Sequence, residues 1–297
     1  MAHGMSELAA LVPDVEALTA ALDRADYLAE PGLAVACFLA LRLPQPLLLE
    51  GEPGVGKTEA ARAIATVLDS PLLRLQCYEG LTAADALYEW DYARQLLTIR
   101  RAEASGQDVT DADLFDDRHL LRRPVLRAVE HPGPRPAVLL IDEVDRADDE
   151  FEAFLLELLA DAAISIPQVG TVRAAVPPVV VLTSNRTRDL HDALKRRCLY
   201  HWIDYPAPER ALAIVRRRVP ESSAPLVVQA VSAVQRIRDV DLQKPPGIAE
   251  TINWVAALTV LGVERVDAST FGATVGSLCK YREDVEAVRS IGLANLL

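Results

Sequence analysis

A glycine-rich segment near residue 50 carries the residue types that bind phosphate. Gly51-Glu52-Pro53-Gly54-Val55-Gly56-Lys57-Thr58 matches GxxxxGK[ST] and lies between the apolar run 47–49 and the helical run 59–68. In this strand–loop–helix context, backbone N–H groups and the positive helix end can surround a β-phosphate. The lysine would neutralise the β- and γ-phosphates, and the threonine hydroxyl would ligate Mg²⁺. We therefore predict a binding loop that comprises Gly51, Pro53, Gly54, Val55, Gly56, Lys57, Thr58 and Glu59.

Two carboxylates end a second apolar run, residues 137–141, and they are Asp142 and Glu143. In an ATPase with a phosphate loop, the first acid holds Mg²⁺ through water and the second orients the attacking water. A solvated acidic turn is the alternative interpretation. Because the chain also has a phosphate loop, we expect Thr58 and Asp142 to hold Mg²⁺ and Glu143 to be catalytic.

Polar residues also lie next to two further apolar runs. Asn185 follows the run 179–183, at a strand end where it would hold the lytic water or sense the γ-phosphate; a turn-forming asparagine is the alternative. Arg196 and Arg197 precede the run 199–203. An arginine there can stabilise transition-state charge on the ATP of a neighbouring subunit, whereas surface salt bridging is the alternative. We favour Arg197 for this role.

The order of these runs predicts the architecture. Helical spacing between residues 6 and 42 is followed by five short apolar runs separated by helical or loop stretches, which is typical of a parallel sheet covered by helices. About sixty residues between the second and third runs, with the acidic stretch 108–117, indicate an insertion. From Glu209 onward the pattern is helical. We predict an α/β nucleotide-binding domain at 1–206 and a helical lid domain at 207–297.

Composition excludes several other classes of protein. With 43 acidic and 31 basic residues the net charge is −12, which disfavours a nucleic-acid partner. The four cysteines form no CxxC pair, so we expect reduced thiols. The longest apolar stretch, residues 33–43, is too short to span a membrane. These features predict a cytoplasmic protein without stable membrane insertion.

The motifs together resemble the AAA+ ATPases of the MoxR type. This resemblance spans nearly the whole chain and implies a sheet of order 5-1-4-3-2, a small helical lid, ATP and Mg²⁺ as cofactors, and a homo-oligomer, expected to be a hexamer. More narrowly, four segments resemble the accessory ATPase of molybdenum–copper carbon monoxide dehydrogenase: 74–80, 86–90, 184–188 and 195–198. The resemblance implies a molybdenum hydroxylase as client, maturation of its metal site, and a partner with a von Willebrand factor A domain.

One departure from the family concerns the lid. Many relatives supply a γ-phosphate-sensing arginine from a GxSxRA-like segment, but the corresponding residues 247–252 contain none. Lys244 is the candidate substitute for this arginine.

Two segments are candidates for client contact. Tyr78, Tyr88, Trp90 and Tyr92 lie in the insertion, and residues 164–176 have the pattern of a hairpin. In AAA+ machines such segments tend to face the central pore, although the aromatic residues would equally suit a core of the insertion itself.

Other functions share the same core motifs. A magnesium-chelatase-like or Rubisco-activating motor would differ only in its client. A nucleotide-gated binding scaffold is a further alternative, but it has no need of an activating carboxylate such as Glu143. A DNA-translocating motor is disfavoured by the negative charge.

Overall fold

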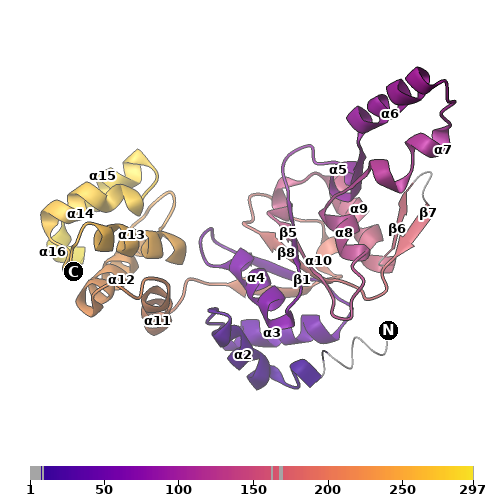
Figure 1. The fold of residues 1–297 in the computed structure, drawn as a ribbon. Helices are drawn as coiled ribbons and strands as arrows, with labels where there is room; N and C mark the ends of the chain where they lie inside the picture. The colour runs from indigo at the N-terminus through magenta and orange to yellow at the C-terminus, as the bar shows by residue number, and fades with distance from the viewer. Residues whose placement is uncertain (1–7, 9, 162, 167–169, 297) are drawn as a thin grey trace. The chain divides into compact units, whose positions relative to one another are not determined.

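The computed structural model describes residues 8, 10–161, 163–166 and 170–296 (Figure 1). Its described residues form two compact units. The first comprises the residues up to 25, then 29–50 and 58–201, and the second comprises 26–28, 51–57 and 202–297. The phosphate loop is therefore grouped with the helical part of the chain. The domain boundary at 206/207 stays a prediction.

The centre of the first unit is a five-stranded sheet of order β2-β5-β8-β1-β9. When its strands are numbered 1 to 5 along the chain and the sheet is followed from β9, this order is 5-1-4-3-2, which confirms the prediction. The pairs β2–β5, β5–β8 and β8–β1 are parallel. All residues of β1 and β5 are buried, as expected for strands covered on both faces. The strands are β1 (Leu47–Gly51), β2 (Leu72–Gln76), β5 (Val138–Asp142), β8 (Val179–Ser184) and β9 (Leu199–Ile203).

Helices accompany this sheet at the places that the sequence predicts. The helical region was expected from Ser6, which lies outside the described residues. Asp14 caps α2, and its Oδ1 accepts a hydrogen bond from Ala17 N at 2.7 Å. The helices outside the insertion are α2 (Val15–Arg24), α3 (Pro31–Arg42), α4 (Lys57–Leu68), α9 (Asp149–Asp161) and α10 (Asp192–Lys195).

The predicted insertion between β2 and β5 is folded and has strands of its own. β3 and β4 pair antiparallel, with Trp90 opposite Leu120. We call α6, α7 and the segment between them the arm; they project from the body of the first unit in Figure 1. The insertion comprises α5 (Ala83–Leu87), β3 (Tyr88–Trp90), α6 (Tyr92–Ser105), α7 (Asp111–Leu114), η1 (Asp117–His119), β4 (Leu120–Arg122) and α8 (Pro124–Val129).

The aromatic residues of the insertion fall into two groups. Trp90 is only 8% exposed and packs edge to face against Tyr88 and Phe115, with ring centroids 6.0 and 5.1 Å away. Trp90 therefore belongs to the core of the first unit. Tyr78 and Tyr92, in contrast, are exposed. Of the two interpretations of this segment, core packing holds for Trp90, and only Tyr78 and Tyr92 remain available to a client.

The expected hairpin before β8 is present in the described residues. β6 (Ala163–Ile166) and β7 (Gly170–Arg173) pair antiparallel. Residues 167–169 lie outside the described residues.

The second unit is helical beyond β9. Its core is built around Trp254, which is fully buried and packs edge to face on Phe271 with centroids 5.9 Å apart. A segment with two consecutive prolines, Pro245 and Pro246, lies between α12 and α13. None of the described helices is long and apolar enough to cross a membrane. The helices are α11 (Pro208–Arg218), α12 (Ala224–Arg238), α13 (Ile248–Val260), α14 (Ala268–Thr274), η3 (Val275–Ser277), α15 (Arg282–Ile291) and α16 (Leu293–Leu296).

Candidate functional site

The phosphate loop joins β1 to α4 and turns through backbone conformations that favour glycine. Gly54 and Gly56 have φ of +79° and +100°, values that a side chain disfavours. The Lys57 ammonium is buried and donates to the carbonyl oxygens of Gly51 and Glu52 at 2.7 and 2.8 Å. The loop therefore holds its own cation in place.

Helix α4 begins at Lys57, so Thr58 and Glu59 lie in its first turn, where the helix dipole attracts anions. Glu59 Oε1 accepts a hydrogen bond from Arg62 Nε at 3.2 Å, in a pair that is exposed to solvent. Thr58 instead points toward the sheet, where its hydroxyl meets Asp142.

Asp142 is the last residue of β5, and its buried carboxylate collects donors from three elements. Its Oδ1 accepts hydrogen bonds from Thr58 Oγ1 at 3.1 Å and from Thr183 Oγ1 at 2.5 Å. Its Oδ2 accepts from Arg74 Nε at 2.9 Å. A hydroxyl and a carboxylate in contact are the oxygen donors that Mg²⁺ prefers, so Thr58 and Asp142 fit this ion.

Glu143 occupies a strained position directly after Asp142. Its backbone is left-handed, with φ 56° and ψ 49°, and its N–H donates to Thr183 Oγ1 at 3.0 Å. Strain of this kind in a non-glycine residue is common at functional sites. Its carboxylate Oε2 accepts from Gln76 Nε2 and from Arg146 Nη1, both at 3.0 Å. These two donors hold the carboxylate in its present orientation.

Asn185 follows β8, and a buried acid holds its loop. Asp145 Oδ1 accepts from Asn185 N at 3.2 Å, and Asp145 Oδ2 accepts from Thr187 N at 2.8 Å. Asp145 follows Glu143 by two residues, and Thr183 contacts both Asp142 and Glu143. The loops after β5 and β8 are therefore joined into one rigid edge of the sheet, and this edge carries Asp142, Glu143 and Asn185.

Arg196 and Arg197 lie between α10 and β9, and both are exposed on the first unit. The Arg197 guanidinium donates through Nη1 to the carbonyl oxygen of Leu156 on α9 at 2.6 Å. Within the part of the chain that the structure describes, the Arg196 guanidinium has no such partner. Neither arginine touches Asp142 or Glu143, so the structure does not assemble them with the acid pair of their own chain.

In the second unit, the start of α13 contacts the phosphate loop directly. Ala249 N donates to the Gly54 carbonyl oxygen at 3.1 Å. A Cβ atom placed on Gly247 would lie 2.8 Å from the Pro53 carbonyl oxygen. The start of α13 thus contacts the phosphate loop through its backbone.

Two cations near this contact differ in their surroundings. Lys244 is exposed, and its backbone N–H donates to Asp284 Oδ2 at 3.2 Å. Arg238 Nε donates to the Pro246 carbonyl oxygen at 2.7 Å, and its guanidinium lies 4.3 Å from the centre of the Tyr205 ring. Burial lowers the pKa of Arg238 from its usual value. Arg238 therefore holds the segment directly before α13 in place.

Sequence reasoning missed the residues that hold the acid pair. Arg74 and Gln76 on β2 contact Asp142 and Glu143, and Thr183 on β8 contacts both. A signal exists in retrospect, because polar residues at the end of one parallel strand meet those of its neighbour. The β2–β5 register places Gln76 opposite Asp142.

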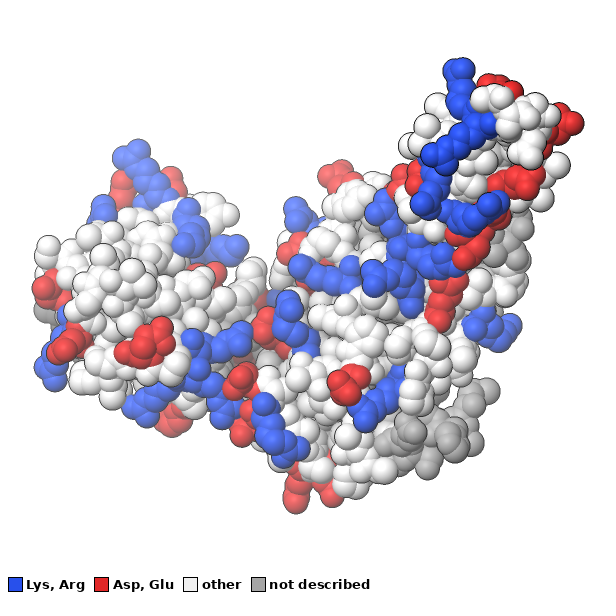
Figure 2. Space-filling model, in the orientation of Figure 1, with Lys and Arg blue, Asp and Glu red and all other residues white. Residues whose placement is uncertain are grey.

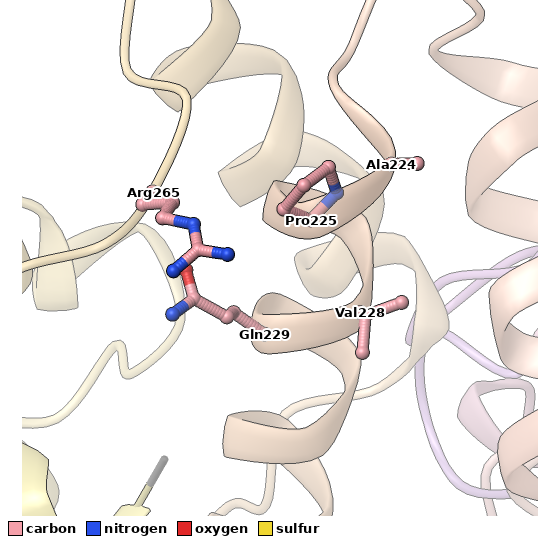
Figure 3. Close-up of a pocket in the computed structure, with 5 residues that line it drawn as sticks. All are labelled: Ala224, Pro225, Val228, Gln229 and Arg265. Carbon is pink, nitrogen blue, oxygen red and sulfur yellow. The ribbon is translucent and has the colours of Figure 1, made fainter.

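A pocket of about 340 Å³ opens on the second unit, away from the phosphate loop in sequence (Figure 3). Gln229 already accepts a hydrogen bond from Val266 N at 3.0 Å. The lining has no carboxylate or imidazole, so it offers no acid–base chemistry. It consists of Ala224, Pro225, Val228, Gln229 and Arg265.

The cysteines are free thiols, as expected. Burial raises the pKa of Cys37, Cys77 and Cys198 to about 12 and that of Cys279 to about 11, so all four stay protonated at neutral pH. Among the described residues, no group of three or more His, Cys, Asp or Glu side chains could hold a metal ion without other ligands.

The parallel sheet, the phosphate loop after β1 and the acid pair at the end of β5 define a P-loop ATPase that uses ATP with Mg²⁺. Residues 46–198 match the family of the AAA domain, dynein-related subfamily. Because this match covers just over half of the 297 residues, the chain belongs to that family.

Individual relatives are more distant. NorQ of Paracoccus denitrificans is 26% identical over 92% of this chain and 95% of its own length. The denitrification regulatory protein NirQ of Pseudomonas aeruginosa is 26% identical over 73% of this chain and 76% of its own length. A solved structure of a RuvB mutant from Thermotoga maritima has a TM-score of 0.47, with 18% identity over 88% of this chain and 69% of that chain. The chain is thus similar to NorQ and NirQ at this level of identity.

Proposed function

We propose that this ATPase hydrolyses ATP with the residues that its loop and acid pair supply. Lys57 neutralises the β- and γ-phosphates, Thr58 and Asp142 hold Mg²⁺, and Glu143 orients the attacking water. When bound, Mg²⁺ offsets the charge that develops on the phosphates. The observation that carries this proposal is the 3.1 Å contact of the Thr58 hydroxyl with Asp142, directly beside Glu143.

Two further roles complete the proposed reaction. Asn185 would position the lytic water, since its loop is fixed to the acid loop through Asp145. Arg197 would stabilise charge on the ATP of an adjacent subunit. Its exposure on the first unit, away from the acid pair of its own chain, suits an action in trans. This arrangement requires a homo-oligomer, and we propose a hexamer.

We further propose that ATP turnover remodels a client metalloenzyme in the cytoplasm. Resemblance in four short segments favours a molybdenum hydroxylase, namely carbon monoxide dehydrogenase, whose molybdenum–copper centre needs copper and sulfur installed at a buried position. Opening a packed site locally costs several kcal/mol, which coupled hydrolysis can supply. A von Willebrand factor A-domain protein would be the partner that links the ATPase to this client.

The arm is the surface that we assign to client contact. On α6, the buried Gln95 side chain faces inward and donates to the Leu114 carbonyl oxygen at 2.7 Å. Tyr92, Leu96 and Leu97 face solvent, with exposed fractions of 67%, 56% and 57%. Figure 2 shows both basic and acidic side chains on the visible face of this arm. The exposed apolar side chains of α6 suit a partly apolar client segment.

Another MoxR-type motor, chelatase-like or Rubisco-activating, would have the same ATP site and a different client. A nucleotide-gated scaffold would bind ATP without turnover. NirQ is a denitrification regulatory protein, which points to another process again, so an experiment decides the client.

A deletion strain tests the client assignment. Carbon monoxide dehydrogenase purified from it should be folded and molybdenum-loaded but should lack copper and the extra sulfur, as measured by metal analysis. Complementation with the wild-type gene should restore both, and Glu143→Gln should not. A complete and active centre in the deletion strain would refute the maturation role.

A further inference from the structure

Arg74 occupies one side of the carboxylate that we assign to Mg²⁺. Its Nε and Nη2 atoms lie 2.9 and 2.6 Å from Asp142 Oδ2. The Asp142 side chain is 4% exposed, whereas that of Arg74 is 49% exposed. A buried carboxylate without a counter-charge is strongly disfavoured. Arg74 therefore supplies the positive charge that Asp142 requires, from a side chain with room to move toward solvent.

We propose that Arg74 and Mg²⁺ compete for Asp142, so that Arg74 is a positioning residue that sets the metal affinity of the site. This inference rests on the proposed role of Asp142 as part of the Mg²⁺ site. Oδ1 is already shared by the hydroxyls of Thr58 and Thr183, and Oδ2 is taken by the guanidinium. Mg²⁺ needs close oxygen ligands in near-octahedral geometry and repels a cation bound to the same carboxylate. Its arrival therefore moves Arg74 outward.

The same arginine is linked to the catalytic carboxylate. The Nη2 atom of Arg74 also donates to Gln76 Oε1, and Gln76 Nε2 donates to Glu143 Oε2 at 3.0 Å. Gln76 is thus ordered at both ends of its amide. When Arg74 leaves Asp142, Gln76 loses one of its two partners, and the hold on Glu143 weakens. Metal binding and release of Glu143 are in this way coupled through two side chains of β2.

Binding of Mn²⁺, a probe for Mg²⁺ that is visible by electron paramagnetic resonance, tests this competition. Mn²⁺ is titrated into the full chain with the β,γ-imido analogue of ATP. Arg74→Gln should lower the Kd for Mn²⁺ between about fivefold and a hundredfold, the range of typical coupling between sites. Arg74→Lys, which keeps the charge without the fork, should lower it less. Arg62→Gln removes an exposed arginine that pairs with Glu59 and should leave the Kd unchanged.

The link to Gln76 is tested by a double-mutant cycle in the same assay. Gln76→Ala alone should also lower the Kd for Mn²⁺. It removes the hydrogen bond from Arg74 to Gln76, so Arg74 leaves Asp142 more easily. Arg74→Gln combined with Gln76→Ala should bind Mn²⁺ no more tightly than Arg74→Gln, since the coupling is then already broken. Additive effects would overturn the link.

A second readout needs no nucleotide. Without divalent ions, Arg74→Gln should unfold at a lower temperature than Arg62→Gln, because Asp142 is left without its counter-charge. Unchanged or weaker Mn²⁺ binding in Arg74→Gln, in a variant that is folded by circular dichroism, would overturn the competition. If Asp142→Asn loses Mn²⁺ while Arg74→Gln matches the wild type, this inference fails and the proposed metal site stands. Wild-type Mn²⁺ binding in Asp142→Asn would refute both.

Discussion

The substitution Gly247→Ala adds a single methyl group and should separate α13 from the phosphate loop. The backbone there has φ −82° and ψ −174°, which any residue adopts, so only space excludes a side chain. The added Cβ would lie 2.8 Å from the Pro53 carbonyl oxygen, 2.9 Å from Glu250 Oε2 and 3.1 Å from the Gly54 carbonyl carbon. Glu250 can rotate away, but the two backbone atoms cannot.

The expected magnitude follows from this geometry. The start of α13 must withdraw from the loop, and the bond from Ala249 N to the Gly54 carbonyl oxygen, 3.1 Å long, must lengthen or break. Overpacking of this kind costs about 1–3 kcal/mol. If the cost falls on the loop conformation that binds ATP, Gly247→Ala raises the Kd for ATP by about 5- to 150-fold.

The assay is a titration of a fluorescent ATP analogue, together with urea unfolding of the same variant. Gly272→Ala is the matched control, because its added Cβ would meet no atom within 4 Å apart from its chain neighbours and the adjacent backbone of its own helix, α14. This control should keep the wild-type affinity and gain about 0.5–1 kcal/mol of stability. Wild-type affinity and stability in Gly247→Ala would refute the direct contact of lid and loop.

Two further predictions concern the subunit interface and the arm. ATPase activity should rise more than linearly with protein concentration. Mixed rings of Arg197→Ala and Lys57→Ala chains should regain activity that neither variant has alone. Full activity in Arg197→Ala by itself would exclude the role of Arg197 at the ATP of an adjacent subunit. Trp90→Ala should lower the free energy of unfolding by about 3–5 kcal/mol because the side chain is buried. Tyr92→Ala, at an exposed position, should change it by less than about 0.5 kcal/mol while weakening client binding in a pull-down.

The core of the fold follows from sequence patterns because those patterns are local. Short continuous apolar runs such as 138–141 are typical of strands covered on both faces, and this one is buried throughout. The phosphate loop is equally local, since its glycines and lysine lie within eight consecutive residues.

The contacts around the acid pair are not local, and this is why sequence reasoning missed them. Arg74 and Asp142 are 68 positions apart and meet only through the β2–β5 register. This register decides which polar residues of β2 lie beside Asp142 on the same face of the sheet. A shift of one residue would move them to the opposite face. The sequence left Trp90 open between client contact and core packing for a related reason. Its burial depends on β4 and on Phe115, which belong to later parts of the insertion.

Paired measurement of ATP binding and turnover in Lys57→Ala and Glu143→Gln tests the central claim most directly. Lys57→Ala should lose ATP binding, because the phosphates lose their counter-charge. Glu143→Gln should bind ATP as the wild type does and hydrolyse it about 10²- to 10⁴-fold more slowly, because only the group that orients water is lost. Hydrolysis at the wild-type rate in Glu143→Gln, or undiminished binding in Lys57→Ala, would contradict the assignment of this site.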